Sequence, residues 1–109
     1  MAYNDAIVER LRAIYSGREG VVEKKMFGGI AFMFNGHMSV GVNGDDLMVR
    51  VGPDLYDHAL AQPHAREMDF TGRSMKGFVF VDLAGFSDDS GLETWVRLSE
   101  QFVRQLPPK

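Results

Sequence analysis

The sequence predicts an α+β protein in which helices pack on one antiparallel sheet. Three observations indicate this class: apolar residues recur at helical spacing near both ends, short alternating segments fill the middle, and two Asn-Gly pairs separate those segments. We expect a two-layer, five-stranded antiparallel sheet packed with helices, in the order α-β-β-β-α-β-β-α. A length of 109 residues suits one domain, 1–109, with a core that needs neither metal nor disulfide.

The first helix is expected over residues 3–16. Ile7, Val8 and Leu11 recur at the spacing of one helical face. Asn4 can cap the start, because its side chain can accept a backbone N–H bond. Gly17 suits the end of this helix, since glycine adopts the left-handed conformation without strain.

The middle of the chain is expected to form an antiparallel meander. Residues 21–34 are interpreted as one long strand that contains the glycine pair Gly28-Gly29. Asn35-Gly36 and Asn43-Gly44 predict two tight turns, because both residue types tolerate positive φ. Between these turns, strict alternation would separate two sets of residues: Met38, Val40 and Val42 on one face, and His37, Ser39 and Gly41 on the other. His37, directly after a turn, is expected to be exposed.

The second half predicts, in order, a helix over residues 53–62, strands over 66–70 and 77–83, and a final helix. The segment Thr71–Lys76, "TGRSMK", is expected to be the loop that links the two strands. Ser90 and Glu93 have the spacing of a capping box, so the final helix is expected to begin near them.

Composition narrows the classes of function. The net charge is −3, with 12 basic and 15 acidic residues dispersed along the chain, which disfavours direct nucleic-acid binding. There is no cysteine, so thiol catalysis, disulfides and cysteine-bound zinc are excluded. The longest apolar run, residues 28–34, is too short to span a bilayer, and the charged N-terminus does not resemble a signal peptide. We therefore expect a cytoplasmic protein without a membrane segment.

Two interpretations of Gly28-Gly29 remain open. The missing side chains could let a ligand or a partner's backbone approach, with Lys25 and Phe27 beside them. Alternatively, the pair bends a strand around the core, and Phe27 anchors the bend. The bend is favoured, because glycine-rich phosphate loops normally lead into a helix and this pair leads into the strand-like "IAFMF".

Basic side chains provide the other candidates for ligand or partner binding. Arg73 and Lys76 would project from the predicted loop, where they could hold a phosphate or carboxylate or simply be solvated. Arg50 lies in the middle of a predicted strand. If that face is covered, its guanidinium needs a partner such as Glu23 or Asp69.

No arrangement of residues predicts catalysis, a metal site or a cofactor. His37, His58 and His64 lack a zinc spacing, and no serine lies in a G-x-S-x-G context. The acidic pairs Asp45-Asp46 and Asp88-Asp89 fit turns and helix starts, where aspartate bonds to backbone N–H groups. We therefore assign no catalytic residue, no metal ligand and no cofactor.

Three motifs, in this order, carry a family resemblance: "KKMFGGIAFMFNGHMSVGV", "DDLMVRVG" and "DFTGRSMKGFVFV". With them the chain resembles the TfoX N-terminal-domain family, also called TfoX/Sxy, from about residue 21 to residue 106. The resemblance implies a two-layer fold related to the secretion-chaperone type. The family's namesake regulates bacterial competence through transcription, and longer members carry a second, helical C-terminal domain. This chain resembles a stand-alone member that lacks it, and the resemblance supplies no catalytic residues.

Two functions follow as expectations. The first is a non-enzymatic regulatory or protein-interaction module whose partner is a second copy of itself or an unidentified protein. The alternative is a small anion-binding or enzymatic domain that uses Lys25, Arg50, Arg73 and Lys76. That alternative requires these charges to converge on one concave pocket.

Overall fold

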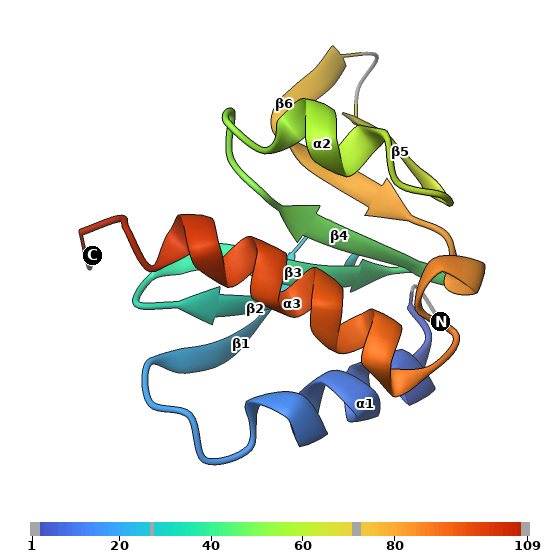
Figure 1. Cartoon of the computed structure of the whole chain (residues 1–109). Helices are drawn as coiled ribbons and strands as arrows, with labels where there is room; N and C mark the ends of the chain where they lie inside the picture. The colour runs from blue at the N-terminus through green and yellow to red at the C-terminus, as the bar shows by residue number, and fades with distance from the viewer. Residues whose placement is uncertain (1–2, 27, 71–72, 108–109) are drawn as a thin grey trace.

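The described part of the chain forms one twisted sheet with helices packed on it (Figure 1). A computed structural model describes residues 3–26, 28–70 and 73–107, and for residues 26, 68–70 and 73–76 it describes the backbone alone. Within these residues the elements are, in order, α1 (Asp5–Tyr15), β1 (Val21–Met26), β2 (Gly29–Phe34), β3 (His37–Asn43), β4 (Asp46–Arg50), α2 (Tyr56–Leu60), β5 (Ala65–Phe70), β6 (Arg73–Val81), the 3₁₀ helix η1 (Leu83–Phe86) and α3 (Asp89–Val103).

The described sheet has six strands rather than the expected five, because the glycine pair closes a hairpin. Met26 pairs with Gly29, so only positions 27 and 28 separate β1 from β2. Gly28 has a φ of +75°, in the left-handed region that glycine enters without a Cβ clash. The prediction of one long bent strand over residues 21–34 is therefore wrong. Phe27, the expected anchor of the bend, lies outside the described residues.

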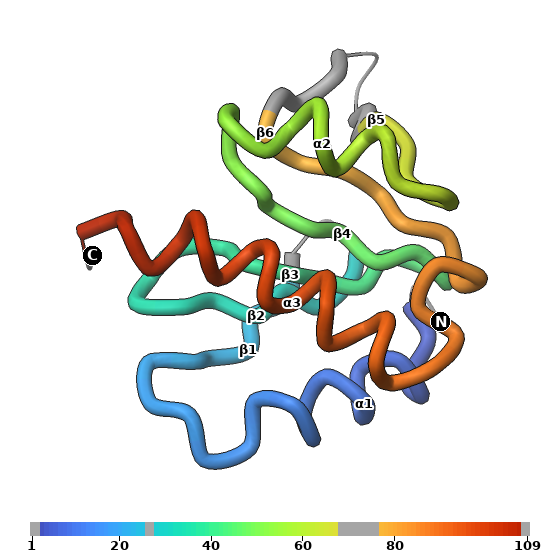
Figure 2. The backbone as a smooth tube through the Cα atoms, in the orientation of Figure 1, coloured from blue at the N-terminus to red at the C-terminus, as the bar shows by residue number. Residues whose placement is uncertain are grey.

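The strand order is β1-β2-β3-β4-β6-β5, and every neighbouring pair is antiparallel. Figure 2 shows β1 at the border of the sheet near α1, and β5 at the opposite border near α2. The backbone of residues 73–76 belongs to β6, with Arg73 opposite Phe70 and Ser74 opposite Asp69. The loop expected over Thr71–Lys76 is thus shorter than predicted, because the strand ladder continues almost to the turn.

All three described α-helices pack on the same face of the sheet. One apolar cluster joins Leu11 of α1, Ala59 of α2 and Leu92 of α3 to strand residues such as Val40 and Val49, and all five are fully buried. Burying each Leu or Val side chain contributes about 1.5–3 kcal/mol, so this helix-facing layer is the main source of stability.

The opposite face of the sheet carries a smaller apolar cluster, formed by Ala31, Met38, Met48 and Phe80. All its members come from strands, and directly opposed residues link them: Ala31 pairs with Gly41, Gly41 with Met48, and Met48 with Phe80. The sheet is therefore apolar on both faces.

A bulge in β3 changes which residues share a face. The register with β2 shifts so that Phe32 lies opposite Val40 but Met33 lies opposite Met38, which leaves Ser39 as the extra residue. Val40 faces the helices, whereas Met38 belongs to the cluster on the other face. The prediction that Met38 and Val40 share a face is therefore wrong, because the extra residue interrupts the alternation of side chains along the strand.

Because of the same bulge, the side chain of Ser39 faces α3 and that of His37 faces the segment after α3. The hydroxyl oxygens of Ser39 and Ser99 lie 2.8 Å apart, and the Ser99 hydroxyl also donates to the Ser39 carbonyl at 2.9 Å. His37 is 8% exposed, and its Nε2 lies 2.6 Å from the carbonyl oxygen of Pro107. The expected exposure of His37 is therefore wrong, because the segment after α3 covers it.

Side chains cap the starts of α1 and α3. Asn4 accepts a hydrogen bond from the N–H of Ala6 at 2.9 Å, which confirms the predicted cap of α1. At α3 the cap is Asp88, which accepts from the N–H of Gly91 at 2.8 Å, rather than the predicted Ser90. No helix in the described part of the chain is long and apolar enough to cross a membrane.

Candidate functional site

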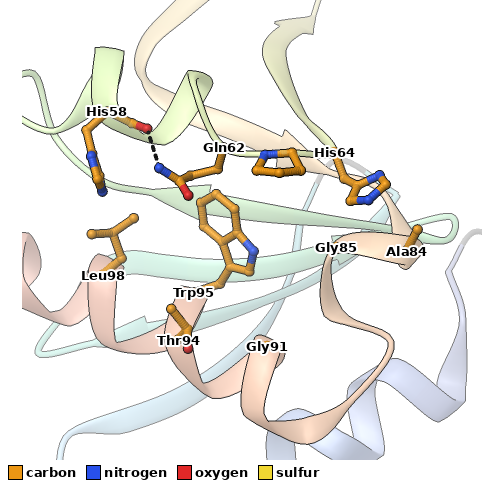
Figure 3. A pocket seen from close by; sticks show the side chains of 10 residues that line it. His58, Gln62, His64, Ala84, Gly85, Gly91, Thr94, Trp95 and Leu98 are labelled. Carbon is orange, nitrogen blue, oxygen red and sulfur yellow. Dashed lines mark hydrogen bonds between the residues drawn. The ribbon is translucent and has the colours of Figure 1, made fainter.

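A pocket of about 320 Å³ opens between α3 and the segment that runs from α2 to β5 (Figure 3). Four short pieces of chain form its walls: α2, the turn after α2, η1 and the first half of α3. The lining residues are His58, Gln62, Pro63, His64, Ala84, Gly85, Gly91, Thr94, Trp95 and Leu98.

Two glycines let these walls come close together. A Cβ added at Gly85 would lie 2.6 Å from Cγ1 of Val81 and 3.0 Å from Cβ of His64, so η1 packs directly on the turn that carries His64. A Cβ added at Gly91 would lie 3.2 Å from the carbonyl oxygen of Gly85, so α3 also starts against η1. The glycines therefore hold the turn, η1 and α3 at a fixed spacing.

His64 is held in an uncommon backbone conformation. Its φ is +70°, a left-handed value that few residues other than glycine adopt. Its carbonyl oxygen accepts the N–H of Asp82 at 2.9 Å, and Gly85 packs against its Cβ. These contacts offset the backbone strain and fix the imidazole of His64 at one end of the pocket, as Figure 3 shows.

Polar side chains from α2 and the turn after it line one side of the pocket. His58 and His64 bring imidazole rings from α2 and from the following turn (Figure 3). One N–H of the Gln62 amide already donates to the carbonyl oxygen of His58 at 3.1 Å, which ties the turn to α2. None of the lining residues is Asp, Glu, Lys or Arg. The only lining groups that can carry a charge are therefore the two imidazoles.

Trp95 connects the pocket to the core. It is 6% exposed and packs in the helix-facing cluster, and its ring lies in the middle of the lining residues (Figure 3). Among the described residues, none accepts a hydrogen bond from its indole N–H. The pocket thus combines a large, rigid aromatic wall with polar groups at its rim, and this composition is typical of ligand sites.

Of the four predicted basic residues, Lys25 and Arg50 do not line this pocket. Lys25 lies on β1 opposite Ile30, and Arg50 lies on β4 opposite Phe78. Two strands, β2 and β3, separate them. The side chains of Arg73 and Lys76 lie outside the described part of the structure. None of the pockets found among the described residues is lined by Lys25 or Arg50.

Arg50 lies between two aromatic rings. Its guanidinium carbon is 5.5 Å from the ring centroid of Phe78 and 5.3 Å from that of Phe102. Burial lowers the pKa of Arg50, because the rings exclude water from the charge. Of the two partners expected for Arg50, the side chain of Asp69 lies outside the described residues. The aromatic contacts give Arg50 a structural role that the sequence did not indicate.

The space left by Gly29 is occupied by the protein itself. A Cβ added at Gly29 would lie 1.9 Å from the carbonyl oxygen of Val42, on the neighbouring strand β3. Gly28, by contrast, is exposed in the hairpin turn. Of the two interpretations, the geometry at Gly29 favours an architectural role, because the approaching backbone is that of β3.

The border strand β1 presents an open edge and several charges. Val22 is 64% exposed, more than any other large apolar side chain in the described residues. Glu23 accepts two hydrogen bonds from Arg12, each 2.8 Å long, which lower the pKa of Glu23. The pairing of Glu23 with Arg50 expected from the sequence is therefore wrong. Lys24 and Lys25 are exposed on the same strand.

The sequence did not predict the pocket, because residues from separate parts of the chain line it. His58 and His64 were considered only as metal ligands, and no group of three or more metal-binding side chains exists among the described residues. Trp95 belongs both to the core cluster and to the lining of the pocket. Because the lining comes from four separate pieces of chain, no spacing in the sequence signals it.

Comparison with known proteins gives a family but no individual relative. Residues 13–103 match the family model described as the TfoX N-terminal domain, which covers well over half of the chain. The comparison with curated proteins gives no match, and the comparison with solved structures gives none either.

Proposed function

The chain belongs to the TfoX N-terminal domain family, and from this premise we propose that it is a non-enzymatic regulatory module that acts by binding protein. Its context would be the regulation of competence or transcription that the family resemblance implies. The partner that we propose is a second copy of the chain, which pairs its β1 with the β1 of the first. The observation that supports this choice is the open edge of β1 and the charges along it.

Every second residue of β1 directs its backbone N–H and C=O groups away from β2, toward the open edge of the sheet. Met26 and Gly29 close the hairpin, and the N–H of Asn35 donates to the carbonyl of Gly20 at 2.9 Å at the other end of the strand pair. In an antiparallel ladder, this pattern makes the even-numbered residues bond to β2. The N–H and C=O groups of residues 21, 23 and 25 therefore point outward, where another strand can pair with them.

Charge selects one register for pairing two β1 strands around a two-fold axis. Residues that oppose each other across the two strands must lie on the same face of the sheet, so the two-fold axis has to pass through a residue of β1. Only the registers centred on Glu23 and on Lys24 then pair five residues of each strand. The register centred on Glu23 places two glutamates directly opposite each other. The register centred on Lys24 places Glu23 opposite Lys25 of the second copy, twice, and leaves one opposed Lys24 pair. Opposite charges stabilise cross-strand pairs and like charges destabilise them, so we favour the second register.

The expected dimer is weak. The favoured register forms about four backbone hydrogen bonds, each contributing about 0.5–1.5 kcal/mol, and two ion pairs of about 0.2–1 kcal/mol each. Association costs several kcal/mol of translational and rotational freedom, which offsets much of this gain. A covalent trap is therefore a more sensitive test than sizing at low concentration.

Lys24→Cys provides this trap, because the chain has no cysteine of its own. On the axis of the favoured register, the two Cα atoms at position 24 would be about 4.5 Å apart, within the range that a disulfide needs. We expect mild oxidation to convert Lys24→Cys into a covalent dimer that keeps the circular dichroism of the fold.

Val22→Cys is the matched control, since position 22 lies on the same face of the same strand and is 64% exposed. Its two copies would be about 13 Å apart in the favoured register, too far for a disulfide. Equal cross-linking of both variants, or cross-linking of neither, would contradict the proposed pairing.

A further inference from the structure

We propose that the pocket lined by His58, His64 and Trp95 binds a small aromatic carboxylic acid. This inference is independent of the pairing at β1, because the pocket lies between α2, η1 and α3, whereas β1 is at the border of the sheet near α1. Three properties of the pocket carry it: its size, a lining with two imidazoles and no carboxylate, and the fixed geometry of its walls.

The size and the walls of the pocket suit one aromatic ring. A volume of about 320 Å³ is at the lower end of the range of ligand pockets, which is about 300–1,000 Å³. Trp95, Leu98 and Pro63 supply apolar surface around this volume. An aromatic ring can stack on, or meet edge-to-face, the indole of Trp95, and such ring pairs contribute about 0.5–1.5 kcal/mol beyond their burial.

The charge that the lining can carry favours an anionic group over a cationic one on the ligand. Each imidazole of His58 and His64 carries at least one N–H that can donate to such a group, and among the described residues the indole N–H of Trp95 makes no hydrogen bond. No carboxylate belongs to the lining, so a ligand cation would find no opposite charge there. A carboxylate accepts several hydrogen bonds at once, and bonds to a charged acceptor are stronger than neutral ones.

The start of α3 does not supply a phosphate site. The N–H of Gly91, the α3 residue nearest the helix start in the lining, already donates to Asp88 at 2.8 Å. The carboxylate of Asp88 also opposes a doubly charged anion beside it. A singly charged carboxylate near the imidazoles avoids this repulsion better than a phosphate does.

The walls are held in place before any ligand arrives. His64 keeps its left-handed backbone through Asp82 and Gly85, and Gln62 bonds to α2 through the carbonyl of His58. Strained backbone that its surroundings hold in place is concentrated at binding sites, because a preformed site loses less entropy when it binds.

The test uses Trp95, the only tryptophan in the chain. Its fluorescence, and its single indole N–H signal in NMR spectra, both report on the pocket. The probes are benzoate, benzyl alcohol and benzylamine, which share one ring and differ in charge. We expect saturable changes with benzoate, with an affinity at least roughly tenfold higher than that of benzylamine and with benzyl alcohol between them; a tenfold difference is about 1.4 kcal/mol.

Two variants test the donors directly. His58→Gln and His64→Asn should each weaken benzoate binding by roughly tenfold, and asparagine is chosen at position 64 because it tolerates positive φ. Arg97→Gln is the control on α3, since Arg97 is exposed, pairs with Glu93 and does not line the pocket. The proposal is wrong if benzylamine binds as tightly as benzoate, if no probe gives a saturable change, or if the control lowers affinity as much as the histidine variants do.

Discussion

Gly29→Ala tests whether the second glycine of the pair serves the sheet rather than a ligand. The φ of Gly29 is not in the left-handed region, so alanine fits the local backbone. The added Cβ, however, would lie 1.9 Å from the carbonyl oxygen of Val42 and 3.0 Å from its carbonyl carbon. A carbon normally stays about 3.3 Å or more from a carbonyl oxygen, so β2 and β3 must separate by more than about 1 Å there.

This separation should lower the free energy of unfolding by about 2–4 kcal/mol. It disrupts one or two backbone hydrogen bonds near the pairing of Ile30 with Val42, each contributing about 1 kcal/mol, and loosens the apolar contact of Ile30. Urea unfolding followed by circular dichroism measures the change, and an unchanged m-value would show that the two-state description still holds.

Gly44→Ala is the matched control for Gly29→Ala. Gly44 has a φ of +59° and nothing within 4 Å of an added Cβ, so its variant isolates the cost of a left-handed alanine, about 1–2 kcal/mol. If Gly29→Ala costs no more than Gly44→Ala, the close approach of β3 is not what requires glycine at position 29. The architectural interpretation of the pair would then be refuted.

Three further predictions concern the polar and aromatic contacts of the core. Tyr15→Phe should reduce the loss of stability between about pH 10 and pH 12. Burial raises the pKa of Tyr15 to about 12, above its unfolded value of 10.0, so the contribution of Tyr15, up to about 2–3 kcal/mol, is lost as pH rises through this range. Burial also raises the pKa of Tyr56, which both proteins retain, so the difference between their unfolding free energies across this range measures the contribution of Tyr15. Arg50→Gln should lower the free energy of unfolding by about 1–2 kcal/mol, and a double-mutant cycle with Phe102→Leu should show a coupling energy of about 1 kcal/mol. A coupling energy of zero would show that the cation–π contact does not stabilise the fold. Ser99→Ala should cost about 1–3 kcal/mol in urea, because it leaves the buried Ser39 hydroxyl and carbonyl without their partner, and a neutral result would show that water replaces it.

Periodicity predicted the class of fold well and the details of the sheet less well. Helical spacing located α1 and α3, and the Asn-Gly pairs located both turns that flank β3, because these signals depend on neighbouring residues alone. The turn at positions 27 and 28 was missed since its first residue is phenylalanine rather than asparagine or aspartate. The bulge at Ser39 was missed because the contact that accompanies it, the hydrogen bond between Ser39 and Ser99, joins residues far apart in the chain.

The candidate site was less predictable than the fold. The positive φ of His64 depends on Asp82 and Gly85, and neither residue is near it in the sequence. Of the basic residues that the sequence singled out, Lys25 and Arg50 lie on β1 and β4, with two strands between them, and neither lines the pocket. A sequence shows which residues are charged. Whether their side chains converge on one site depends on the strand and the face of the sheet on which each residue lies.

Charge reversal across the border strand tests the central claim most directly. Sedimentation velocity over a series of concentrations would compare the wild type with Glu23→Lys, with Lys25→Glu and with the two changes combined. Each single change places like charges opposite each other at both symmetric positions, so we expect the dimer to weaken roughly tenfold. The combined change restores opposite charges and should recover most of the association. If the combined variant is as weak as the single variants, or if none of them differs from the wild type, two copies do not pair through β1 in this register.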